Sequence, residues 1–123
     1  MSQATRAVIL FAHGARDPQW AEPFLQLAGQ VQQKLPGSIV ALAFLELMTP
    51  SLTDCATQLA EQGVSEVIIV PAFMARGAHL RRDLPVLVEK LVQQFPHIQF
   101  RVTAALGEAE PVLAAMADWV TRQ

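Results

Sequence analysis

The apolar run VIIV (residues 67–70) is followed directly by PAFMARGAHLRRDLP (residues 71–85), and the two form a transition from strand to helix. The apolar run predicts a buried parallel strand, and an amphipathic pattern predicts a helix over residues 84–95. The connecting loop contains one glycine, one histidine and three arginines. Histidine can ligate a metal or transfer a proton, and arginine can bind carboxylates. The loop therefore predicts a site where a metal and a carboxylate-rich molecule meet.

The same pattern of strand, loop and helix occurs four times along the chain. Short apolar runs predict strands over residues 7–12, 39–45, 66–72 and 98–104, and apolar residues recur at helical spacing after each run. This rhythm predicts a single α/β domain over residues 1–123, with a four-stranded parallel sheet and helices on both faces. Right-handed crossovers make it a flavodoxin-like doubly wound fold with strand order 2-1-3-4.

Capping and turn residues indicate where the helices begin and end. Asp17-Pro18 and Thr49-Pro50 are each predicted to be an N-cap followed by the first helical residue. Gly63 is predicted as the C-terminal cap of the second helix, and Pro111 as the opening of the last one. The final strand alternates more than the others, as expected at a sheet edge.

Composition and charge exclude several classes of protein. The chain has 123 residues, 52% hydrophobic and 16% charged, with a net charge of −2. These values fit one compact domain and argue against a general nucleic-acid binder. No apolar run approaches the ~20 residues of a membrane helix, and the N-terminus does not resemble a signal peptide. The lone Cys55 excludes a disulfide framework and a cysteine-based zinc site, so a cytoplasmic protein is expected.

The predicted topology brings three chemically capable side chains to one edge of the sheet. His13 follows the first strand, Glu46 closes the second, and His79 lies in the loop after the third. Ligands of open α/β sheets bind beyond the carboxyl ends of the strands, and strands one and three should be neighbours. Two imidazoles and a carboxylate suit cobalt, nickel, iron or zinc, with coordination positions left open for a substrate.

Each of these residues also has an ordinary structural interpretation. His13 alone could be a turn residue, and His79 alone could be a solvated loop side chain; their shared edge favours function. His97 is predicted to lie on the surface at the opposite edge, and the arginines could be solvated charges. Met48 and Met74 could fill a loop or line an apolar pocket. The GxGxxG spacing and the Walker lysine are missing, which disfavours a nucleotide.

Four motifs give the chain a family resemblance. They are His13-Gly14-Ala15-Arg16-Asp17-Pro18, Phe44-Leu45-Glu46, Pro50-Ser51-Leu52 and Gly77-x-His79-x-x-x-Asp83-x-Pro85. From about residue 6 to 120 the chain resembles the short-form sirohydrochlorin cobaltochelatases of anaerobic cobalamin synthesis, relatives of the sirohydrochlorin ferrochelatases. The domain would then be one chelatase-like half.

The resemblance implies roles for individual residues. His13 would be a metal ligand and proton acceptor, His79 the second metal ligand, and Glu46 a substrate contact. The tetrapyrrole pocket would be lined by the loop Met74, Ala75, Arg76, Gly77 and Ala78. Arg16, Arg76, Arg81 and Arg82 would hold the peripheral carboxylates of sirohydrochlorin. The family usually has serine where this chain has Ala15, so a hydroxyl near the first ligand is lost.

A metal chelatase is therefore expected, inserting cobalt or iron, with nickel as a further substrate metal and with no other cofactor. Short chains of this kind are expected to pair as homodimers that recreate the cleft of two-domain chelatases. Two alternatives remain at this point. One is a non-catalytic carrier of metal or tetrapyrrole, and the other is an interaction domain with incidental histidines.

Overall fold

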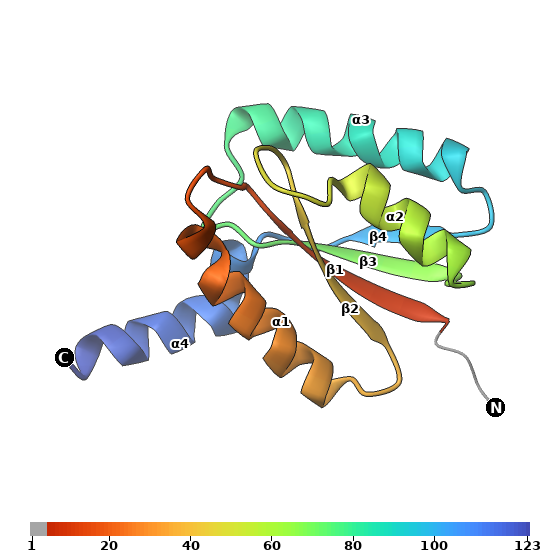
Figure 1. Ribbon diagram of the computed structural model, residues 1–123. Coiled ribbons are helices and arrows are strands. Elements are labelled where there is room, and N and C mark those ends of the chain that lie inside the picture. Colours follow the sequence, from red (N-terminus) through yellow and green to blue (C-terminus); the bar gives the residue numbers. More distant parts are fainter. Residues whose placement is uncertain (1–4) are drawn as a thin grey trace.

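A parallel sheet of four strands forms the centre of the molecule (Figure 1). The computed structural model describes residues 5–123. The strands are β1 (Arg6–Ala12), β2 (Ile39–Phe44), β3 (Glu66–Pro71) and β4 (Gln99–Val102). All three strand pairs are parallel and the order is β2-β1-β3-β4, which confirms the predicted topology.

The helices lie on both sides of this sheet, as predicted. α2 (Leu52–Glu61) and α3 (Ala78–Gln94) cover one face, whereas α1 (Glu22–Lys34) lies on the other (Figure 1). α4 (Glu110–Thr121) also lies on the α1 side but projects away from the sheet, and none of its residues is buried. Its main contacts are with the short 3-10 helix η2 (Leu106–Glu108). The apolar stripe of the last helix is therefore left largely exposed within one chain.

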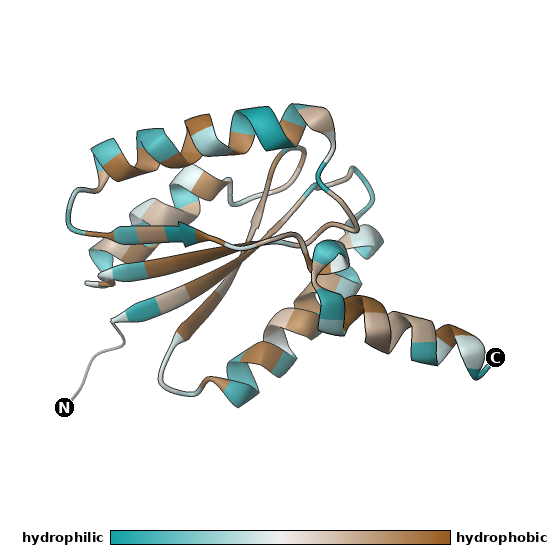
Figure 2. Cartoon of the chain, turned by 180° about the vertical axis from the view of Figure 1, so that it is seen from behind, coloured by the Kyte–Doolittle hydropathy of each residue, from teal (hydrophilic) through white to brown (hydrophobic). Residues whose placement is uncertain are grey.

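The main core fills the space between the sheet and the α2 and α3 helices. Alternate residues of β1, including Ile9 and Phe11, point into it and are fully buried. β1 pairs with strands on both sides, so residues 7–12 are buried along the whole strand. Figure 2 shows the resulting hydrophobic colouring along the strands, and it also shows hydrophobic stretches on the projecting α4. In the part of the chain that the structure describes, no helix has the length and apolar character of a membrane span.

The start of α3 differs from the sequence prediction. The helix begins at Ala78, with Gly77 as its N-cap, instead of near residue 84. The amphipathic pattern that predicted the helix starts at Leu84, whereas the helix also includes the largely polar residues 78–83, and Pro85 lies inside it. Pro85 and Arg81 are both exposed, so water can reach the Arg81 carbonyl that lacks a helical donor. His79 therefore lies on the first turn of a helix and not in a loop.

Two of the predicted caps are confirmed and one is wrong. Asp17 Oδ1 accepts a hydrogen bond from the Gln19 amide at 2.9 Å and caps η1 (Pro18–Ala21), the 3-10 turn before α1. Gly63 has a φ of 82° and ends α2 as predicted. Thr49 is not a cap, because the backbone after it pairs with the end of β2 through a 2.9 Å bond from the Phe44 amide to the Pro50 carbonyl. Ser51 caps α2 instead.

The remaining boundaries shift by one or two residues. β2 and β3 each end one residue before the prediction, and β4 is shorter at both ends. α4 begins at Glu110, with Pro111 in its first turn as expected.

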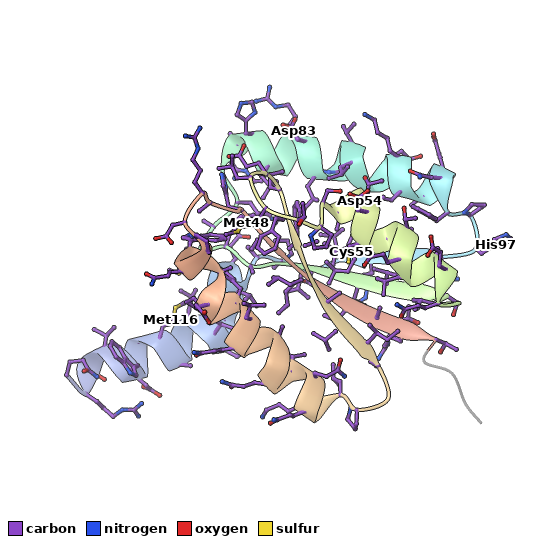
Figure 3. The ribbon with its side chains drawn as sticks, viewed as in Figure 1. Met48, Asp54, Cys55, Asp83, His97 and Met116 are labelled. Carbon is purple, nitrogen blue, oxygen red and sulfur yellow. The ribbon has the colours of Figure 1, made fainter. Side chains whose placement is uncertain are left out.

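The buried thiol of Cys55 allows a stability prediction. Cys55 points from α2 into the core (Figure 3), and burial raises the pKa of its thiol from 9.0 to about 11. The unfolded chain ionises first as pH rises, so stability is full below pH 9 and is lost towards pH 11. We expect the free energy of unfolding to fall by about 2–3 kcal/mol in this window from this group alone.

The test compares urea unfolding of the wild-type chain and of Cys55→Ala from pH 8 to pH 11. The variant lacks the thiol, so its profile should fall less steeply. Parallel profiles would contradict the assigned effect of burial.

Candidate functional site

His13 and Glu46 lie side by side where β1 and β2 end. The distance from His13 Nε2 to Glu46 Oε1 is 3.0 Å, and both side chains are about half exposed. Backbone bonds continue the pairing of the two strands beyond their ends: the Leu45 amide donates to the Ala12 carbonyl at 2.8 Å and the Glu46 amide to the His13 carbonyl at 3.0 Å. The imidazole and the carboxylate are therefore brought together by main-chain geometry.

Gly14 makes this approach of the two loops possible. Its φ is +97°, and a Cβ at this position would overlap the Glu46 carbonyl oxygen. Next to Glu46, Leu47 has a positive φ of 67°, which is an unfavourable conformation for a branched side chain. Backbone strain of this kind clusters at ligand-binding and active sites. The local conformation thus supports a functional role for this edge of the sheet.

His79 approaches the same region from the first turn of α3. It lines a cavity of about 480 Å³ together with His13, Glu46, Phe73 and Asp83. The Phe73 ring packs edge-on against the His13 imidazole, with centroids 6.3 Å apart, and against Phe11 of the core at 6.2 Å. The cavity is thus anchored on the core through Phe73. His79 itself is 91% exposed, one helical turn from Asp83.

A second cavity adjoins the first on the α1 side. It has a volume of about 530 Å³ and is lined mainly by apolar residues, among them Leu47 and Met48, with Arg16 as its charged member. Met48 is half-buried, and Figure 3 draws it near the start of α1. Met48 therefore lines a pocket, one of the two interpretations that its sequence position left open.

The residues of the loop before α3 lie in different environments. Ala75 and Gly77 line the histidine cavity. Arg76 is engaged elsewhere, in an ion pair of 3.1 Å between its Nε and Glu108 Oε1. Met74 and Ala78 are exposed and do not line this cavity, and Arg81 and Arg82 are exposed on the first turn of α3. His97 lies at the opposite end of the sheet, between α3 and β4 (Figure 3).

Sequence reasoning did not identify Leu45, Phe73, Leu80 or Asp83 as cavity residues. Of these four residues, Asp83 is the one that the sequence could most readily have indicated. It follows His79 by four residues, and that spacing brings two side chains together once both are on a helix. The prediction of a loop at this position concealed the relation.

The possible metal-ligating side chains around the cavity are few and come from separate elements. Within residues 5–123 no group of three or more histidine, cysteine or acidic side chains is gathered closely enough to hold a metal ion. The cavity offers imidazole and carboxylate groups from several elements instead.

Comparisons with known proteins agree on one family. The CbiX family model matches residues 7–123. A sirohydrochlorin cobaltochelatase of Sulfurisphaera tokodaii is 33% identical over 113 residues, which cover 92% of this chain and 89% of that protein. One from Methanocaldococcus jannaschii is 34% identical over 82 residues, 67% of this chain and 57% of the relative.

Two solved structures are similar in fold. A CbiX protein of cobalamin (vitamin B12) biosynthesis from Marinobacter aquaeolei VT8 has a TM-score of 0.84 and 32% identity, with 95% of each chain covered. The sirohydrochlorin chelatase SirB of Bacillus subtilis subspecies spizizenii, in complex with cobalt, has a TM-score of 0.80 and 19% identity. The match covers 96% of this chain but only 50% of SirB.

The close approach at Gly14 can be tested by mutation. Gly14→Ala should lower the free energy of unfolding by more than ~1 kcal/mol, because the new methyl group collides with the Glu46 carbonyl and φ is positive. Gly29→Ala is the matched control. Gly29 lies in α1 with no atom within 4 Å of the added carbon, so alanine should stabilise the chain by about 0.5–1 kcal/mol. Equal effects in urea unfolding would contradict this account.

Proposed function

This chain belongs to the CbiX family, and we propose that it is a sirohydrochlorin chelatase that inserts a divalent metal into the macrocycle. The observation that carries the proposal is the cavity shared by His13, Glu46 and His79, at the carboxyl ends of the strands of a chain matched by the family model from residue 7 to 123. Cobalt is the first candidate metal, because the relatives are cobaltochelatases. Iron is the second, since SirB structures contain cobalt or Fe³⁺.

The proposed roles follow from the chemistry of insertion. The tetrapyrrole must lose two pyrrole N–H protons, and the metal ion must exchange water for the ring nitrogens. His13 and His79 would first hold the incoming ion. Once the ring nitrogens take the ion over, the freed imidazole of His13, together with Glu46, would accept protons at the mouth of the cavity. An imidazole has an ordinary pKa near 6.5, which suits proton transfer at neutral pH. No cofactor other than the substrate metal is required for this exchange.

The peripheral carboxylates of sirohydrochlorin need cationic partners. Arg16, Arg81 and Arg82 are exposed around the two cavities and are proposed to bind them. Each exposed pair contributes only about 0.2–1 kcal/mol, so several must act together. Arg76 is already paired with Glu108, and its proposed role is to shape the loop from Met74 to Ala78 that borders the substrate.

We also propose that the chain works as a homodimer in the cytoplasm, without nucleic-acid or membrane partners. The chain exposes 7973 Å², whereas a folded monomer of its mass typically exposes about 6,500 Å². The difference is on the order of 1,000 Å², and a standard interface covers about 800 Å² per partner. The chain also spans half of SirB, so two copies would match its length. The cytoplasmic assignment rests on the free thiol of Cys55.

The surface proposed to meet the second copy is on α4. This helix has no buried residue, and Leu113, Trp119 and Val120 are 46%, 60% and 62% exposed. Exposed apolar surface of this extent, on a helix that projects away from the sheet, is typical of an interface between subunits.

The chelatase activity can be tested by anaerobic absorbance of sirohydrochlorin with Co²⁺, Fe²⁺ or Ni²⁺. We expect multiple turnovers per subunit, and at least a ~100-fold loss in His13→Ala and in His79→Ala. His97→Ala is the control, since His97 lies at the opposite end of the sheet, and it should keep full activity. A reaction that stops after one equivalent would indicate a carrier, and full activity of His13→Ala would refute the role of that residue.

The dimer can be tested by sedimentation velocity. Trp119→Asp should shift the protein from dimer to monomer, because a carboxylate would replace an aromatic side chain in the interface. Val92→Asp is the matched control: Val92 is also exposed, near the carboxyl end of α3, and its substitution should leave the dimer intact. A monomeric wild-type protein would refute the proposed assembly.

A further inference from the structure

We propose that Asp83 positions His79 by accepting a hydrogen bond from its Nδ1–H, so that Nε2 is the nitrogen offered to the metal. The inference rests on the proposed function, because it assigns the atoms of the same site. Asp83 lines the cavity that contains both histidines. The two residues are one turn apart on α3, with Nδ1 of His79 3.5 Å from Oδ2 of Asp83. Both side chains are exposed, so a small rotation brings the atoms to hydrogen-bond distance.

An imidazole can offer only one nitrogen to a given ion, and its tautomer decides which one. A hydrogen bond from one ring nitrogen to a carboxylate fixes the proton there and leaves the lone pair on the other nitrogen. With Nδ1–H directed at Asp83, the lone pair of His79 lies on Nε2. Free imidazole side chains favour the opposite tautomer in water, so Asp83 would have to reverse an intrinsic preference.

The other histidine has the reverse arrangement. Nε2 of His13 is 3.0 Å from Glu46 Oε1, so a neutral His13 that donates to Glu46 carries its lone pair on Nδ1. Each imidazole thus has its own carboxylate, supplied by a neighbouring loop for His13 and by the same helix for His79. The two histidines would present different nitrogens to the ion.

This arrangement has a consequence for metal transfer. A carboxylate that accepts a hydrogen bond from the ring N–H makes the other ring nitrogen a stronger ligand, and loss of such a partner typically weakens metal affinity 10–100-fold. Asp83 would therefore strengthen the hold of His79 on the metal without touching it. As an exposed polar contact within one helix, it contributes little to folding, so variants at this position should remain folded.

The first measurement uses the metal-free protein and the long-range ¹H–¹⁵N couplings of the histidine rings. We expect the Nδ1–H tautomer at His79 in the wild-type chain and a shift towards Nε2–H in Asp83→Ala. Glu89→Gln is the matched control: it removes a carboxylate from the exposed surface of the same helix, where Glu89 contacts Gln93, and it should leave His79 unchanged. An Nε2–H tautomer in the wild-type chain would overturn the proposal.

The second measurement is a titration with Co²⁺ alone, followed by its visible absorption. Asp83→Ala should weaken binding 10–100-fold, Asp83→Glu should recover most of the affinity, and Glu89→Gln should match the wild type. Equal affinity of Asp83→Ala and wild type would overturn the positioning role. If the wild type binds no Co²⁺, the proposed chelatase function fails, and the tautomer measurement still decides the role of Asp83.

Discussion

The close main-chain contact between Gly14 and Glu46 is the constraint on which the candidate site depends. β1 and β2 continue to pair through their backbones past the last residue of each strand, and only glycine allows the loops to come this near. The contact delivers the His13 imidazole and the Glu46 carboxylate to one point, although 33 residues separate them. Both side chains are about half exposed, and Phe73 packs against the imidazole, but the backbone pairing sets the distance between the two groups.

A second close main-chain contact fixes the loop that leads to His79. The Gly107 amide donates to the Phe73 carbonyl at 2.8 Å, and a Cβ on Gly107 would collide with the backbone of Met74. Glu108 reinforces it, because its Oε1 accepts hydrogen bonds from Arg76 Nε and from the Ala105 amide. The loop that leads to His79 is thus tied to the loop after β4. The two contacts thus fix the main chain beside the exposed side chains of the candidate site.

The sequence predicted the features that follow from strand periodicity and topology. Apolar runs of the right length gave the four strands, and the parallel order then placed His13 and Glu46 at one edge. His79 was predicted in a loop but lies on α3, because the amphipathic pattern starts at Leu84 while the helix already begins after Gly77. The pair of Arg76 and Glu108 was not predictable, since 32 residues separate two ordinary surface charges. The apolar stripe of α4 predicted a packed helix, but periodicity does not specify which chain covers it.

The candidate site and the apolar surface of α4 are both exposed to water in a single chain. Charges and dipoles act strongly on a reacting group only where water is excluded, and in this chain His79 is 91% exposed and His13 about half exposed. One chain alone therefore leaves both imidazoles in a high-dielectric environment. The macrocycle can cover one side of the cavity when it binds, because its apolar ring is large compared with a histidine. In the proposed homodimer, a second copy would meet the apolar surface that α4 exposes among the described residues.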